Sequence, residues 1–297
     1  MTTTRTPALA IEPPLTAYAA HLRREERAGA TIEKYTRDIR AFAAWLDGAA
    51  ITKDAAVAYK EHLVKTRAPA GVNAVIAALN GFFAYLKVDI KLKPLKIQRQ
   101  TYTDASRELT RAEYVRLIAA AQHNGGSVWL VLQTICATGI RVSELRYITA
   151  EAARQGFAVI TNKGKTRTVF LPKGLTAQLC KYIKEQKIES GCIFIARNGR
   201  PIDRRSVWFK MKKLCSAANV NKAKVFPHNL RRLFARTFYA KHKDIVKLAD
   251  ILGHSDVRTT RIYVMESGDE HRKRVDCLGL VFPDAKIPRG ARHRRGE

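Results

Sequence analysis

Apolar side chains recur at helical spacing along residues 11–93. In TIEKYTRDIRAFAAWL they return every three or four positions, and Thr31 stands where an N-cap residue belongs. NAVIAALNGFFAYLK repeats the pattern. We therefore predict a bundle of about four helices, with its aromatic rings packed in the core. The predicted core positions are Ile32, Tyr35, Ile39, Phe42 and Leu46 in the first stretch and Val75, Ile76, Leu79, Phe82, Phe83 and Leu86 in the second.

The helical period lapses over residues 94–107, where Pro, Gln, Thr and Ser predict an exposed linker. Thr110 and Glu113 then have the spacing of a capping box at the start of a new helix. Two β-rich runs, FAVIT and RTVFLP, flank NKGK and predict a hairpin with Lys163 in its turn. Helical patterns cover residues 127–137, 174–187, 203–218, 228–241 and 244–252, and a short helix is expected near Arg141.

These patterns predict a fold that is mainly α with a small β-sheet. The expected organisation is a tail over 1–10, a helical domain over 11–93, the linker over 94–107, a second domain over 108–284 and a basic tail over 285–297. That last stretch is rich in Pro, Gly and Arg, so we expect it to be disordered and to contact a phosphate backbone.

Net charge is the unusual feature of the composition. The formal charge is +28, and residues 94–297 hold 40 Lys and Arg against 17 Asp and Glu. A polyanionic partner is therefore expected, with nucleic acid first and an anionic membrane surface second. No apolar stretch approaches the roughly 20 residues of a membrane span, and the N-terminus lacks the apolar core of a secretory signal.

Cysteine and histidine usage predicts a cytoplasmic protein without a metal or another cofactor. The five cysteines are scattered without a CxxC pair, which is typical of reduced thiols. The eight histidines form no HxH or HExxH cluster.

Four separated stretches carry side chains suited to phosphate chemistry, although none is specific alone. ATGIRVSEL has an arginine at an expected helix start and an acidic residue one turn later. NKGK has a lysine in the predicted turn, and PHNLRRLFAR has His and Arg at i and i+3 on one helical face. LGHSDVRTTRIY has His after Gly and a tyrosine further on. The candidate residues are Arg141, Glu144, Lys163, His228, Arg231, His254 and Tyr263.

Together, these residue types suit phosphoryl transfer without a metal. Two guanidiniums can bind the non-bridging oxygens of a phosphate bidentately and hold positive charge where the transition state accumulates negative charge. A phenol ionises only near pH ~10 in water, so neighbouring cations and an imidazole would help it to act as a nucleophile. A lysine on a turn can protonate the leaving oxygen.

The wording and order of the four stretches resemble the tyrosine recombinase family, which includes phage integrases and Xer-type recombinases. The resemblance covers residues 10–280, because the N-terminal helical region looks like the family's core-binding domain. It implies that Arg141 and Arg231 clamp the phosphate and that His254 donates a hydrogen bond to it. Glu144 matches an acidic position that orients Arg141.

The resemblance also implies how protons move. Tyr263 would be the nucleophile that forms a 3′-phosphotyrosine, and His228 a general base or proton relay. Lys163 would be the general acid. The turn NKGKTR is one residue shorter than the family's common GKGNKER form, so Lys165 is the alternative acid.

The implied partners are double-stranded DNA with specific recombination sites, a homotetramer on synapsed DNA that passes through a Holliday junction, and possible accessory DNA-bending proteins. A C-terminal segment with Leu278, Leu280 and Phe282 would dock on a neighbouring protomer or pack on its own domain. Integration, excision, inversion and resolution all remain open. Two other functions compete: a type IB topoisomerase-like enzyme, which the compact N-terminal bundle disfavours, and a catalytically silent DNA-binding regulator, which the filled catalytic positions disfavour.

Overall fold

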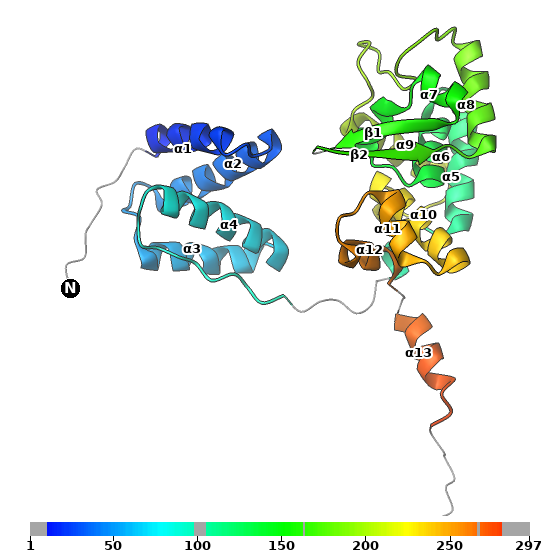
Figure 1. The fold of residues 1–297 in the computed structure, drawn as a ribbon. Helices are drawn as coiled ribbons and strands as arrows, with labels where there is room; N and C mark the ends of the chain where they lie inside the picture. The colour runs from blue at the N-terminus through cyan, green and yellow to red at the C-terminus, as the bar shows by residue number, and fades with distance from the viewer. Residues whose placement is uncertain (1–10, 98–104, 163, 266–267, 281–297) are drawn as a thin grey trace, which may run out of the picture. The chain divides into compact units, whose positions relative to one another are not determined.

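The computed structural model describes residues 11–97, 105–162, 164–265 and 268–280. Contacts divide the chain into two compact units, Met1–Arg99 and Gln100–Glu297 (Figure 1). Among the described residues, no helix is both long and apolar enough to cross a membrane.

The first unit is the predicted helical bundle. Its helices are α1 Glu12–Arg24, α2 Gly29–Leu46, α3 Lys53–Thr66 and α4 Pro69–Tyr85. The helical spacing is confirmed, because Ile39, Phe42, Phe82 and Phe83 are fully buried in a single core. Tyr35 and Leu86, also expected in that core, pack against it while half-buried.

The predicted N-cap of α2 was wrong. Ala28 occupies the N-cap position without a side-chain hydrogen bond, and Thr31 lies inside the first turn, where its backbone N–H donates to the Ala28 carbonyl. The Ala28 carbonyl accepts from the backbone N–H groups of Thr31 and Ile32, so the helix starts three residues earlier than the threonine suggested. Past α4, Asn80 and Asn73 hold the backbone of Leu92 and Leu95, so the start of the expected linker is bound to the bundle.

The second unit is mostly helical around one hairpin, as predicted. Its elements are η1 Ala105–Arg107, α5 Arg111–His123, α6 Val128–Thr138, η2 Val142–Tyr147, α7 Ala150–Gln155, β1 Phe157–Asn162, β2 Lys165–Phe170, α8 Lys173–Glu185, α9 Arg204–Ala217, η3 Lys222–Lys224, α10 Pro227–His242, α11 Ile245–Leu252, α12 Val257–Val264 and α13 Gly268–Asp276. The capping box of Thr110 and Glu113 opens α5 as expected. The short helix expected near Arg141 is the 3-10 helix η2.

Two packing arrangements position the site. Strands β1 and β2 pair antiparallel, with Ile160 opposite Arg167 and Ala158 opposite Val169. Helix α10 packs against both α6 and α12, so it lies between the end of α6 and the segment that carries Tyr263 (Figure 1). A small separate core joins α10, α11 and α12. Residues 285–297 lie outside the described residues.

Candidate active site

The site begins where α6 ends. Gly139 closes α6 in the left-handed region at φ +66°, and a β-carbon there would collide with Phe234 and lie 2.9 Å from Leu252. The tight turn therefore requires glycine. It places Arg141 at the start of η2 with a side chain that is 35% exposed. The Gly139 carbonyl accepts a hydrogen bond from Nη1 of Arg231.

Glu144 is the buried anion of the site, with a side chain that is 2% exposed. Its Oε2 accepts from the backbone N–H of Arg141 at 2.8 Å and from Nη2 of Arg167 at 2.7 Å. Its Oε1 accepts from Nη1 of both arginines at 3.1 Å. Burial alone would raise the pKa of Glu144, but hydrogen bonds and charges from Arg167 and Arg141 hold that pKa below its ordinary value. The carboxylate is therefore ionised at neutral pH and holds the Arg141 side chain in place.

Arg231 is a buried cation fixed by three acceptors. Besides the Gly139 carbonyl, its Nη2 donates to the Leu252 carbonyl at 2.7 Å and contacts Nε2 of His254 at 2.9 Å. Burial, aided by the charge of Arg141, lowers the pKa of Arg231 to about 10. The guanidinium therefore keeps its charge at neutral pH.

The contacts of His254 define its tautomer. A guanidinium can only donate hydrogen bonds, so Nε2 of His254 accepts from Arg231. The ring proton then lies on Nδ1, which donates to Oγ1 of buried Thr260 at 2.8 Å. Burial and the nearby charges of Arg231 and Arg141 lower the pKa of His254 to about 4. In this arrangement Nε2 has no proton to give, so the predicted donation to phosphate would require it to leave Arg231 and gain one.

Tyr263 lies on α12 and is 8% exposed. Its ring centroid lies 5.1 Å from that of His228 and 5.3 Å from that of His254. Cζ of Arg231 lies 5.9 Å from the ring centroid. The phenol ring is therefore surrounded by two imidazoles and a guanidinium.

His228 stands in the first turn of α10, directly after Pro227. Burial lowers its pKa, and the charges of Arg232, Arg231 and Arg204 lower it further. The positive end of the helix dipole acts in the same direction. His228 is therefore neutral at pH 7 and able to accept a proton.

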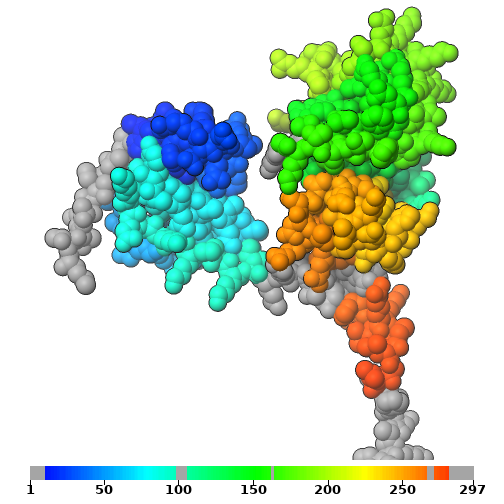
Figure 2. Space-filling model, viewed as in Figure 1, coloured from blue at the N-terminus to red at the C-terminus, as the bar shows by residue number. Residues whose placement is uncertain are grey.

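A cavity of about 530 Å³ opens beside these groups, lined by Arg141, Lys165, Thr166, Arg167, Asp250, Gly253, His254, Ser255 and Thr259. Apart from Arg141, its lining residues come from β2 and from the end of α11 to α12, whose surfaces adjoin in Figure 2. Lys165, the alternative acid, thus lines the same cavity as Arg141 and His254. Lys163 lies outside the described residues. The predicted site residues that the structure describes are all brought together.

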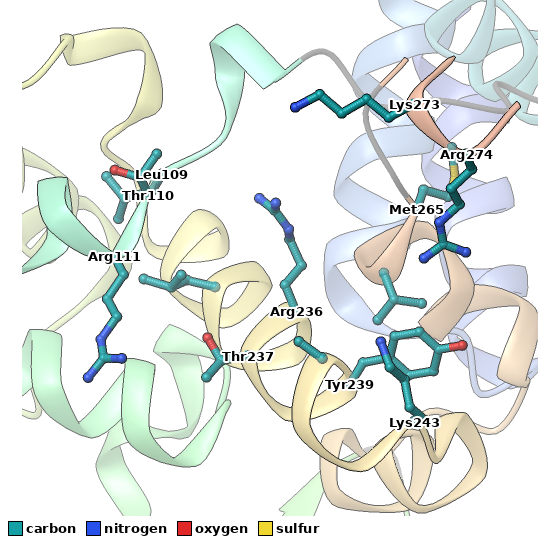
Figure 3. A pocket seen from close by; sticks show the side chains of 13 residues that line it. Leu109, Thr110, Arg111, Arg236, Thr237, Tyr239, Lys243, Met265, Lys273 and Arg274 are labelled. Carbon is teal, nitrogen blue, oxygen red and sulfur yellow. The ribbon is translucent and has the colours of Figure 1, made fainter. Parts of the chain in front are cut away.

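A second cavity of about 540 Å³ adjoins the segment that follows Tyr263 (Figure 3). Leu233, Ala240, Val264 and Met265 give it apolar walls. The cavity is also lined by basic side chains: Arg111, Arg236, Lys243, Lys273 and Arg274. Arg236 pairs with the buried carboxylate of Glu108. Beyond α13, Leu278 and Leu280 are exposed, and Phe282 lies outside the described residues.

Arg167 is the site residue that sequence reasoning missed. It stands opposite buried Ile160 and two positions before buried Val169, so its side chain lies on the inward face of the hairpin. An inward arginine among apolar neighbours needs a buried anion, and Glu144 supplies it. The alternation of RTVFLP was the available signal. Among the described residues, no group of three or more His, Cys, Asp or Glu side chains could hold a metal ion.

Comparison with known families gives two matches. The phage integrase family matches residues 107–269, and the phage integrase N-terminal SAM-like domain matches residues 15–88. Tyrosine recombinase XerA of Thermococcus kodakarensis is 28% identical over 275 residues, which cover 89% of this chain and 94% of that protein. Tyrosine recombinase XerD of Listeria innocua is 25% identical over 258 residues, covering 78% and 86%.

Solved structures share the fold. XerH site-specific recombinase bound to difH in a post-cleavage complex superposes with a TM-score of 0.68 at 18% identity, covering 84% of this chain and 80% of that one. A lambda integrase tetramer bound to a Holliday junction also gives 0.68 at 18% identity, covering 88% and 78%. At these identities the likeness establishes the arrangement of helices and hairpin.

Proposed function

This chain belongs to the phage integrase family, and on that premise we propose that it is a site-specific recombinase that cuts and rejoins DNA through a covalent 3′-phosphotyrosine. The main support is the surroundings of Tyr263. Two neutral imidazoles lie within 5.3 Å of its ring, centroid to centroid, and the charged Arg231 lies beside it. This combination suits a phenol that must lose a proton and attack an anionic phosphate.

In the proposed cleavage, Oη of Tyr263 attacks the phosphorus and a P–O bond to tyrosine forms. The bond to the 5′-oxygen breaks, His228 takes the phenolic proton, and a lysine protonates the departing 5′-oxygen. Arg141 and Arg231 neutralise the non-bridging oxygens. One ester bond is exchanged for another, so the reverse step rejoins DNA without ATP.

We propose Lys163 as the acid, and its competitor is Lys165, which lines the cavity. A positioned acid contributes roughly 10²–10⁴ in rate. Lys163→Ala should therefore cleave ordinary DNA slowly but recover on a substrate with sulfur as the bridging 5′-atom, because a thiolate leaves without a proton. Arg141→Ala should not recover on that substrate. Rescue of Lys165→Ala in place of Lys163→Ala would assign the role to Lys165.

The proposed partner is double-stranded DNA in the cytoplasm, bound by four copies at synapsed sites, with accessory DNA-bending proteins as further candidates. The net charge of +28 supports the DNA. The exposed Leu278 and Leu280 suit docking into the second cavity of a neighbouring copy, whose walls include Val264 and Met265. Removing residues 278–297 should then weaken assembly of four copies on DNA, measured by sedimentation.

A nicked suicide substrate tests the proposed function against its two competitors. A recombinase should become covalently attached and, with two intact sites, should exchange strands between them. A type IB topoisomerase-like enzyme would attach but only relax supercoiled DNA. A silent regulator would bind DNA and form no adduct.

A further inference from the structure

Resting on the proposed function, we propose that Arg167 is a positioning residue of this site. It fixes the Glu144 carboxylate, and Glu144 in turn holds Arg141 against the phosphate. The contacts that support this role join β2 to η2 across 23 residues of sequence.

Both terminal nitrogens of the Arg167 guanidinium are bound to Glu144, so they are not available to bind a substrate bidentately. Nη1 and Nη2 donate to Oε1 and Oε2 of Glu144 at 3.1 and 2.7 Å, and the side chain is only 16% exposed. Its Nε is buried and has no partner among the described residues. Arg167 thus acts through Glu144, whereas Arg141 is more exposed and has only Nη1 engaged by that carboxylate.

The Glu144 carboxylate needs both arginines. It accepts four hydrogen bonds, two from each, which matches its capacity as an ionised acceptor. Without Arg167, one side of the carboxylate would be unpaired, and its charge would be shared with Arg141 alone. The carboxylate would then either rotate or pair fully with Arg141, and the charge of Arg141 would no longer be available to the phosphate.

Arg167 also packs where the chain turns toward His254. An ideal β-carbon on Gly253 would lie 2.9 Å from both Cδ and Nη1 of Arg167, so any larger residue there would force this side chain to shift. Three segments meet at this guanidinium: β2, η2 and the Gly253–His254 turn. The hairpin and the clamp are thereby held as one unit.

The test is DNA cleavage by the Arg167→Lys variant. Lysine keeps the positive charge but cannot donate two parallel hydrogen bonds to the Glu144 carboxylate. At saturating DNA we expect phosphodiester cleavage to slow by about 10- to 100-fold, the range for lost charge-assisted hydrogen bonds, with DNA affinity unchanged. On a methylphosphonate substrate, which lacks one non-bridging charge, the difference from wild type should largely disappear, since less clamping is required. Arg154→Lys is the matched control, because its guanidinium forks onto the Glu189 carbonyl and does not line the cavity.

The result that overturns the proposal is an equal loss on both substrates, which would mean general damage, or no loss on either. Arg167→Gln, which keeps an amide donor for Glu144, should show the same substrate dependence and provides a second test if the lysine variant folds poorly. If wild type itself forms no covalent adduct, the proposed function fails instead, so the two failures are distinguishable.

Discussion

Replacing Glu144 with Gln should destabilise the second unit by about 3 kcal/mol at pH 7, the low end of the cost of breaking a buried ion pair. The side chain is 2% exposed and accepts four hydrogen bonds from two arginines. Glutamine keeps only one of the two acceptor oxygens. Its amide NH₂ takes the place of the other oxygen and faces guanidinium groups that can only donate. Water can bind part of the Arg141 guanidinium in the variant, because this side chain is 35% exposed, so the expected cost stays at the low end of the range.

Urea unfolding followed by tryptophan fluorescence measures this difference. A Trp45→Phe background leaves Trp129 and Trp208, which both lie in the second unit. Glu151→Gln is the control: that carboxylate accepts from the Gly191 N–H, a contact that glutamine retains.

The pH dependence provides the sharper check. Because folding lowers the pKa of Glu144 below 4.5, its stabilisation is fully present above pH 4.5 and is lost as the pH falls through the folded-state value. The gap between wild type and Glu144→Gln should therefore be constant from pH 7 to about 5 and shrink below about 4.5. A gap under about 1 kcal/mol at pH 7, typical of an exposed pair, or one that does not shrink in acid, would refute the reasoning.

Three further predictions concern His254, Gly253 and the binding of DNA. Folding lowers the pKa of His254 from 6.5 to about 4, so the unfolded state binds the extra proton between those values, and stability should fall as the pH drops from 6.5 to 4; a His254→Gln variant should show a shallower fall in urea titrations. Gly253→Ala should lower the free energy of unfolding by at least about 1–2 kcal/mol, because residue 253 has a left-handed backbone conformation. The same variant should cleave DNA more slowly, because the added methyl group displaces Arg167. An unchanged cleavage rate would contradict the proposed packing of Arg167 against Gly253. DNA affinity should fall with salt with a log–log slope of magnitude at least ~5, and removing residues 286–297 should reduce that slope without changing which sequence is preferred.

Local pattern predicted most of the fold. Helical spacing identified the bundle core, and the β-rich runs around NKGK identified the hairpin, because both signals depend only on neighbouring residues. The family expected from four motifs is confirmed by the two family matches. Thr31 was misplaced because the backbone can begin a helix without a side-chain cap.

Features that depend on contacts between residues far apart in the chain were harder to predict from the sequence. The predicted elements did not include α12, although Asp256 caps it and its buried Thr260 and Tyr263 have helical spacing. The tautomer of His254 depends on Arg231, which lies 23 positions earlier in the chain. Arg167 looks like an ordinary strand residue until Glu144 is seen beneath it. Burial of Tyr263 depends on α10 and α11 packing around α12.

The most direct test of the central claim is to identify the residue that carries the DNA. A nicked suicide substrate should trap the wild-type protein, and mass spectrometry of the digested complex should find the nucleotide remnant on Tyr263. Tyr263→Phe should bind the same DNA with similar affinity and form no adduct. An adduct on any other tyrosine, or trapping by the Phe variant, would contradict the account.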